Sequence, residues 1–326
     1  MLPRLPRSIR RLSWPIRAVR FRQLLKPQVK DVAALKGLRK VRYLGWAGGI
    51  AEYSAQTDNG LIWILQAQRD DPSDVAQNLQ FAYRGFNSII GRGPLGVPVD
   101  RAVIPEIGAL VLDNPDGVRL SWIIRDGVGD EIEGLTRAGA WLAALHEGFE
   151  VRPGGFDALE RVDEATYPYR KWLESQADGD RLELLAGSAV DMAQKLDGAL
   201  VDYTKFHRTY SPRAVHIGEA RTLVTELQAT KRRPRCYDIT YFLLEAAFLA
   251  QKRALPQDDM GLPDGWLDVF LLGYDRSDPT LLRMIRFALM ARMIEVYIQG
   301  SARKRRSPTF RAKRDVIFEM AQAMGF

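Results

Sequence analysis

The segment Val215–Ala247 carries the side chains of this sequence that are best suited to chemistry. It contains His216 and, among its carboxylates, Glu219, Glu226 and Asp238. Carboxylate oxygens bind magnesium, so these three side chains could together hold a metal ion. A basic cluster follows Glu226: Lys231, Arg232, Arg233 and Arg235. Such a cluster could bind phosphate, an anionic lipid headgroup or nucleic acid, and a solvated loop explains it equally well.

Position by position, this segment resembles the catalytic segment of the aminoglycoside phosphotransferase and choline kinase-like family. In that family a His-Gly-Asp opens a loop whose Asp accepts the proton of the substrate hydroxyl, and an Asn and a second Asp then bind magnesium. His216 matches the family His, and ELQATKRRPRCYDI keeps the spacing of the family pattern IDF-x-x-A-x-x-(G/R)-x-P-x-x-YDLA. The resemblance places Glu226 at the metal-binding Asp, and Asp238 at an Asp that bonds backbone in a structural role.

The residues that perform the chemistry in the family are replaced here. Gly218 stands at the position of the catalytic Asp and Leu223 at that of the Asn, and the interval from His216 to Glu226 is shorter than in the family. A one-residue slip would instead place Glu219 at the position of the base. Leucine removes a metal ligand outright, because magnesium needs near-ideal octahedral oxygen coordination. Glutamate in place of Asp adds a methylene, where a misplacement of ~1 Å can cost on the order of 100-fold in rate.

The resemblance implies an α+β, bilobal protein-kinase-like fold, with a small antiparallel-sheet N-lobe and a larger, mostly helical C-lobe. We expect a basic N-terminal arm over residues 1–37, the N-lobe over 38–116 and the C-lobe over 117–326. The residues themselves predict a strand meander over Lys40–Gln68, with a tight type I′ hairpin turn at Asp58-Asn59-Gly60. LTRAGAWLAALHEGF has helical periodicity and FLLGY follows later in the chain, and both resemble family motifs that support the fold.

The nucleotide pocket implied by the resemblance is also incomplete. Gly48 and Gly49 fall where a loop covers the phosphates, although an ordinary strand turn explains them equally well, and Asp113 falls in the hinge. Gln66 stands where the family has a Lys that contacts the phosphates and pairs with a Glu of the next helix. That helix, from Asp74 to about Ile90, supplies no such Glu. We therefore expect a degenerate nucleotide pocket.

The net charge of +7 is concentrated at the N-terminus, where every charged residue before Asp31 is basic. Ile9, Leu12, Ile16 and Val19 recur at helical spacing among these arginines. We expect an anion-binding face here, with four representative residues: Arg10, Arg11, Arg17 and Arg20. Such a helix could lie on an anionic membrane, at ~1 kcal/mol per basic residue near the surface. Alternatively, the segment packs on the N-lobe or is disordered.

Composition narrows the remaining classes of function. No apolar run is long enough to span a bilayer or to act as a secretory signal, and a lone Cys236 fits a reducing compartment. The three histidines include His146, which we interpret as structural, and they form no metal-binding spacing with Cys. We expect a cytoplasmic protein. Peripheral attachment to the membrane through the N-terminal arm is compatible with this expectation.

Three hypotheses about function follow. The first is a pseudokinase, a scaffold or regulatory protein that needs no cofactor and binds a protein partner or an anionic membrane lipid. The alternative is an active, ATP-dependent small-molecule phosphotransferase whose metal site is rearranged around Glu219 and Glu226. The third is a nucleic-acid or lipid-binding module that uses the basic clusters, although the sequence contains no recognised nucleic-acid-binding motif.

Overall fold

The computed structural model describes residues 14–47, 50–67, 72–91, 93–166, 179–207, 209–227, 232–304 and 308–325. Gly48 and Gly49 lie outside these ranges, as do Arg10, Arg11 and Lys231. The chain forms two compact units. The first holds Met1–Asp116 with Leu223–Gln228, and the second holds Gly117–Thr222 with Ala229–Phe326. Glu226 therefore belongs to the first unit, although most of the segment around it in the sequence belongs to the second.

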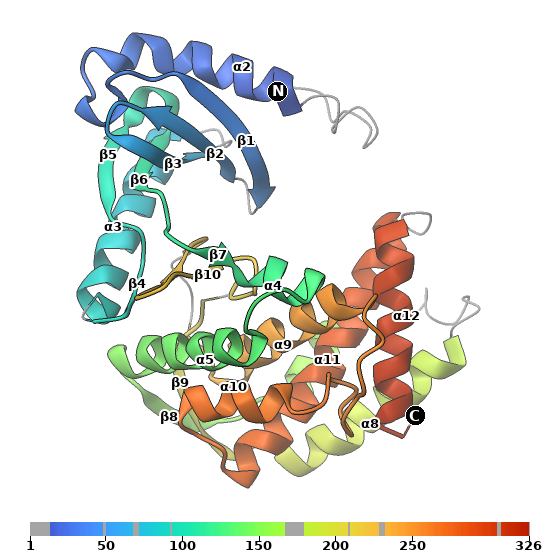
Figure 1. The fold of residues 1–326 in the computed structure, drawn as a ribbon. Helices are drawn as coiled ribbons and strands as arrows, with labels where there is room; N and C mark the ends of the chain where they lie inside the picture. Colours follow the sequence, from blue (N-terminus) through green and yellow to red (C-terminus); the bar gives the residue numbers. More distant parts are fainter. Residues whose placement is uncertain are drawn as a thin grey trace. The chain divides into compact units, whose positions relative to one another are not determined.

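The first unit is built on a five-stranded antiparallel sheet (Figure 1). Its order is β1-β2-β3-β6-β5, and the strands are β1 (Lys40–Ala47), β2 (Ile50–Thr57), β3 (Gly60–Ala67), β6 (Ala109–Asp113) and β5 (Asp100–Ile104). The short strand β4 (Leu95–Gly96) precedes β5, and the 3-10 helix η3 (Pro105–Ile107) joins β5 to β6. The meander expected from the sequence is confirmed.

The hairpin between β2 and β3 forms where Asp58-Asn59-Gly60 predicts it, but its turn type differs. Thr57 pairs with Gly60, which leaves Asp58 and Asn59 as the loop. A type I′ turn needs positive φ at both loop residues. Here neither residue has positive φ, and Gly60 takes it instead, at 106°. The type I′ prediction is therefore wrong, because the glycine supplies the left-handed conformation one position later.

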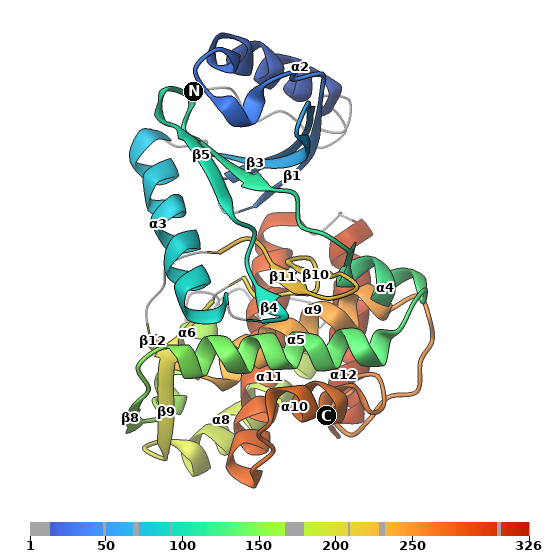
Figure 2. The same cartoon turned by 60° about the vertical axis from the view of Figure 1, so that its left-hand side comes forward.

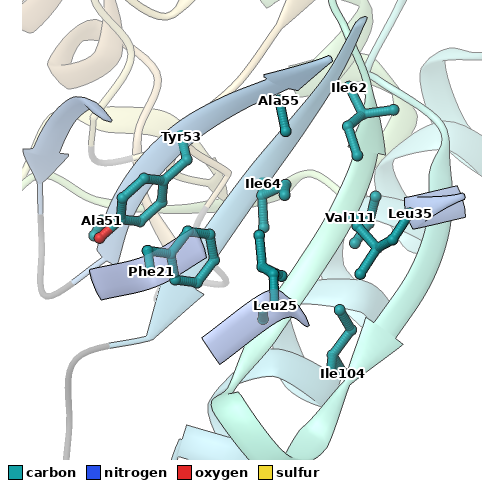
Figure 3. Packing of buried hydrophobic residues seen from close by; sticks show 11 residues of the cluster. Phe21, Leu25, Leu35, Ala51, Tyr53, Ala55, Ile62, Ile64, Ile104 and Val111 are labelled. Atoms are coloured by element: carbon teal, nitrogen blue, oxygen red, sulfur yellow. The ribbon is translucent and has the colours of Figure 1, made fainter. Parts of the chain in front are cut away.

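One face of this sheet is covered by the N-terminal helix. Helix α2 (Trp14–Leu25) buries Phe21 and Leu25 against the sheet, and Phe21 stacks on Tyr53 with ring centroids 3.9 Å apart (Figure 3). The 3-10 helices η1 (Lys26–Val29) and η2 (Ala33–Leu35) continue this layer, and Leu35 is fully buried. Residues 14–35 thus contribute to the core of the first unit. This part of the N-terminal segment follows the alternative in which the segment packs on the N-lobe.

Helix α3 (Pro72–Ile90) contacts β3, β5 and β6. Side chains alternate along a strand, so the faces of the sheet can be told apart. Ile62 and Ile64 point to the α2 side, and Trp63 and Leu65 are buried on the other side. Alternation therefore leaves the second face of the sheet to α3, whose buried residues include Tyr83.

The second unit is mostly helical (Figure 2). Its helices are α4 (Leu120–Asp126), α5 (Glu131–Gly148), α6 (Ala158–Thr166), α8 (Gly179–Leu196), α9 (Cys236–Ala250), α10 (Trp266–Tyr274), α11 (Pro279–Lys304) and α12 (Pro308–Ala323). Its short strands are β7 (Val118–Arg119), β8 (Arg152–Gly155), β9 (Leu200–Lys205), β10 (Val215–Ile217) and β12 (Arg232–Pro234). Strand β11 (Thr222–Val224) starts in this unit and ends in the first.

Helices α5 and α10 lie side by side at very short range (Figure 2). A Cβ atom at Gly139 would lie 2.1 Å from the Phe270 carbonyl oxygen, and one at Gly273 would lie 1.9 Å from the Thr136 carbonyl oxygen. No side chain fits at such distances, so both glycines are required by the approach of the two backbones. The helix ending in LAALH and the FLLGY segment therefore support the fold by packing against each other.

No helix in the described ranges is both long and apolar enough to cross a membrane.

Replacing Gly273 by Val should force α5 and α10 apart and lower the free energy of unfolding by about 2 kcal/mol or more. Gly187→Ala is the matched control, because Gly187 lies in α8 with open space around its Cβ position. That change should raise stability by about 0.5–1 kcal/mol. Urea unfolding followed by circular dichroism measures both. Wild-type stability in the Gly273→Val protein would show that the helices do not need this close contact.

Candidate functional site

The loop that would carry the catalytic base is reduced to a four-residue turn. Strand β10 ends at Ile217 and β11 begins at Thr222, and the Gly218 N–H donates to the Arg221 carbonyl oxygen at 2.8 Å. The backbone of Gly117 lies directly against this turn, since a Cβ atom there would be 2.2 Å from the Ile217 oxygen. The turn offers one carboxylate, that of Glu219, which is exposed.

His216 is held as a neutral, buried side chain in the second unit. It pairs with Arg119 across β10 and β7 and is 4% exposed. Burial, together with the positive charge of Arg119, lowers the pKa of His216 to about 3. A histidine with that pKa binds no proton near neutral pH. It therefore matches the family His in position and contributes no charge to the turn.

Glu226 lies in the first unit, close to Tyr83 of α3 and Glu52 of β2. Burial raises the pKa of the Tyr83 phenol, and the carboxylates of Glu52 and Glu226 raise it further. Glu226 also adopts a left-handed backbone, with φ of 61°. For a residue with a side chain this conformation costs on the order of 1 kcal/mol or more, and such strain often marks functional positions. Among the expected site residues that the structure describes, Glu226 is the one with a backbone outlier.

The positions expected to hold magnesium are divided between the two units. Glu219 belongs to the second unit and Glu226 to the first, and Leu223 is a buried residue of β11. Within the described residues there is no group of three or more His, Cys, Asp or Glu side chains placed to hold a metal ion. Neither unit by itself therefore presents the magnesium site that the resemblance implies.

The position on β3 that would carry the phosphate-binding lysine is Leu65, one residue before Gln66. Gln66 follows Ile62 and Ile64 at intervals of two residues and so lies on the α2 side, where its side chain donates to the Ile107 carbonyl oxygen at 3.4 Å. A lysine that pairs with the following helix must face α3, and the residue on that face is Leu65, directly opposite Glu52. A shift of one residue moves every side chain of a strand to the other face.

The ion pair between strand and helix is absent in either register. Strand β3 reads GLIWILQA and has no basic residue, and the only acid of α3 is Asp74 in its first turn. Arg84 of α3 instead pairs with Asp100 at 2.8 Å. Asp113, expected in the hinge, pairs with Arg101 at 2.5 Å on the surface of the first unit. None of these contacts provides a positive charge for nucleotide phosphates on the α3 side of β3.

Asp238 is the centre of a buried hydrogen-bond network in the second unit. Its Oδ2 accepts from the His207 backbone N–H at 2.8 Å and lies 3.1 Å from His146 Nε2. The Tyr274 hydroxyl lies 2.7 Å from His146 Nδ1. Since the carboxylate can only accept, Nε2 carries the proton, and the Tyr274 hydroxyl donates to Nδ1. Burial lowers the pKa of His146, against the influence of Asp238. The network joins α5, α9 and α10 and has a structural role.

The basic residues expected to form one anion-binding cluster separate in the structure. Arg232 donates to the Glu150 carbonyl oxygen and pairs with its carboxylate at 2.6 Å. Arg235 is buried, with Nε 3.7 Å from Asp202 Oδ2. Arg233, between them, is exposed, and no carboxylate of the described residues pairs with it. One arginine of the three is therefore available to a ligand.

Among the arginines of α2, too, one has a partner within the protein and another is exposed. Arg17 donates to the Tyr43 hydroxyl at 3.3 Å and lies over its ring, 5.3 Å from the centroid. Arg20, one turn further along the helix, is exposed.

No family model matches this sequence. No curated protein matches it either. Solved structures do match. Aminoglycoside 2'-phosphotransferase-IIIa in its GDP complex is similar with a TM-score of 0.64 and 11% identity, over 94% of this chain and 98% of that chain. Spectinomycin phosphotransferase APH(9)-Ia, in complex with ADP and spectinomycin, gives a TM-score of 0.58 and 12% identity, over 93% and 98%.

A choline/ethanolamine kinase family protein from Mesorhizobium loti is similar with a TM-score of 0.56 and 15% identity, over 88% of each chain. At these identities the likeness is one of fold. The bilobal α+β protein-kinase-like fold expected from the sequence is thus confirmed, with a small antiparallel-sheet unit and a larger, mostly helical one.

Proposed function

We propose that this chain, which has the fold of the aminoglycoside phosphotransferases and choline kinases, is a pseudokinase that acts by binding. The observation that carries the proposal is the four-residue turn Gly218–Arg221. Phosphoryl transfer leaves the protein little covalent work, so its rate depends on positioning and on charges placed around the phosphates. A turn of this length holds neither a base at Gly218 nor a second metal ligand.

Losses in the first unit support the same proposal. The α3-facing side of β3 has Leu65 and no basic residue that could reach nucleotide phosphates, and α3 has no acid beyond its first turn. These losses are independent of the turn in the second unit. Two separate parts of the phosphate-binding apparatus are therefore missing, which a single shift in alignment would not produce.

The alternative is an active ATP-dependent phosphotransferase that uses Glu219 and Glu226. The left-handed backbone of Glu226 favours this alternative, because backbone strain is common at functional sites. For such an enzyme Glu226 would bind the metal and Glu219 would act as the base.

Calorimetric titration with ATP, with and without magnesium, separates the two. The pseudokinase proposal predicts that magnesium does not strengthen nucleotide binding, since the described residues contain no cluster of side chains placed to bind the ion. Glu226→Gln should then bind ATP like the wild type. Binding that requires magnesium and is lost in Glu226→Gln would instead support the active enzyme.

We also propose that the exposed face of α2 attaches the protein to an anionic membrane surface. Ile16 and Val19 are 55% and 57% exposed, and Arg20 and Arg22 are exposed beside them. Apolar residues that insert at the interface, flanked by arginines, are the pattern of a peripheral membrane helix. Phe21 and Leu25 hold the opposite face of the helix in the core of the first unit, which fixes the helix to the body of the protein.

Vesicle sedimentation tests this attachment. The wild type should bind vesicles containing phosphatidylserine more strongly than pure phosphatidylcholine vesicles, and high salt should weaken the binding. The double change Ile16→Asp, Val19→Asp should abolish it. Phe81→Asp is the control, because Phe81 is an exposed apolar residue of α3. Equal binding of the double variant and the wild type would refute the attachment. Deletion of residues 1–30 is unsuitable, because it removes Phe21 and Leu25 from the core.

A further inference from the structure

The second unit contains a cavity of about 380 Å³ bounded by α6, the segment after β9, β12, α9 and α11. All of its lining residues belong to this unit, so the cavity exists independently of the first unit. Its volume is in the range of pockets that hold small molecules. The cavity is separate from the turn Gly218–Arg221, none of whose residues line it.

Positive charge predominates among the side chains of this cavity. Three guanidinium groups line it, those of Arg161, Arg233 and Arg292, against the two carboxylates of Glu164 and Glu295. Arg233 comes from β12 and is the arginine of the basic cluster that has no carboxylate partner among the described residues. An anion entering the cavity would therefore meet an excess of guanidinium donors.

Glu295 fixes two of these guanidinium groups side by side. Its Oε2 lies 2.8 Å from Arg161 Nη2 and 2.8 Å from Arg292 Nη1, and its Oε1 accepts from Gln299 at 2.9 Å. Burial alone would raise the pKa of Glu295, but the charges of Arg292 and Arg161 lower it overall. One permanent anion thus holds two cations, and each arginine keeps further N–H donors for a ligand.

Aromatic rings hold the same two arginines from another side. Arg161 lies over Tyr237, 5.6 Å from the ring centroid, and Arg292 lies over Tyr241 at 4.8 Å. A guanidinium held by both a carboxylate and a ring loses little further freedom when it binds a ligand. The arrangement is therefore preorganised, which lowers the entropic cost of binding.

An unsatisfied hydroxyl also lines the cavity. Thr240 is 2% exposed, and its Oγ1 has no hydrogen-bond partner among the described residues. Leaving a buried polar group unpaired costs ~1–3 kcal/mol, so such groups usually meet a ligand or water. This observation does not depend on the arginines, and it places an unsatisfied polar group in a residue that lines the cavity.

We propose that this cavity binds a small hydroxylated compound carrying a phosphate monoester. The guanidinium groups match the geometry and charge of a phosphate dianion, which Arg binds through two parallel hydrogen bonds. The Thr240 hydroxyl and the carboxylate of Glu164, which also pairs with Arg161 at 3.5 Å, provide partners for hydroxyl groups of the ligand. A polyamine such as kanamycin would place its ammonium groups against the arginines and should be rejected. The proposal holds whether or not the chain transfers phosphoryl groups.

Calorimetry with glucose 6-phosphate, ribose 5-phosphate and glycerol 3-phosphate tests this site, with glucose, inorganic phosphate and kanamycin as comparison compounds. At least one phosphate monoester should bind more tightly than all three comparison compounds. Arg233→Gln should weaken that binding ~10-fold or more, as expected for a lost charge-assisted hydrogen bond. Arg232→Gln is the matched control, because Arg232 neighbours Arg233 on β12 and does not line the cavity.

Thr240→Val separates a ligand site from a structural one. Valine has the shape of threonine without the hydroxyl, so the free protein should unfold at an equal or higher temperature while the phosphate monoester binds ~5-fold or more weakly. The proposal is overturned if no phosphate monoester binds, if inorganic phosphate or kanamycin binds as tightly, or if Arg233→Gln binds like the wild type. Discovery of kinase activity would overturn the pseudokinase proposal and leave this site unaffected.

Discussion

The length of chain between Ile217 and Thr222 constrains everything that this fold can do. Four residues are enough to connect β10 to β11, with one backbone hydrogen bond from Gly218 to Arg221 across the turn. On the pseudokinase proposal they are too few to place a base and a metal ligand around a substrate, and the backbone of Gly117 lies directly against the turn. The strands can pair as the fold requires, while in this proposal the turn lacks the residues for transfer.

The interactions that maintain the architecture are intact by contrast. Gly139 and Gly273 allow α5 and α10 to meet at backbone contact, and Asp238 links α9 to α5 through His146. Each of these residues belongs to a segment that resembles the family. Residues that support the fold and residues that perform transfer are different sets, so the second set can be replaced without loss of the first. This separation explains how identities of 11–15% accompany agreement in fold.

The sequence predicts best what depends on local chemistry. The Asn59-Gly60 hairpin, the helix through His146 and the absence of acids from α3 beyond its first turn all follow from composition and spacing. The face occupied by Gln66 is harder, because a one-residue difference in register reverses a strand. The arginine-lined cavity could not be predicted, since Arg161 and Arg292 come together only when α6 packs on α11. The burial of Phe21 likewise depends on tertiary contacts that a basic, amphipathic segment does not reveal.

Phosphoryl transfer itself is the most direct test of the account. The purified protein would be incubated with magnesium and ATP labelled at the γ-phosphate, together with a pooled set of hydroxylated and amino compounds, beside the Glu226→Ala variant. The account predicts that labelled product forms no faster with either protein than without protein. Product that the wild type forms and Glu226→Ala does not would contradict it, and would identify Glu226 as part of a working site.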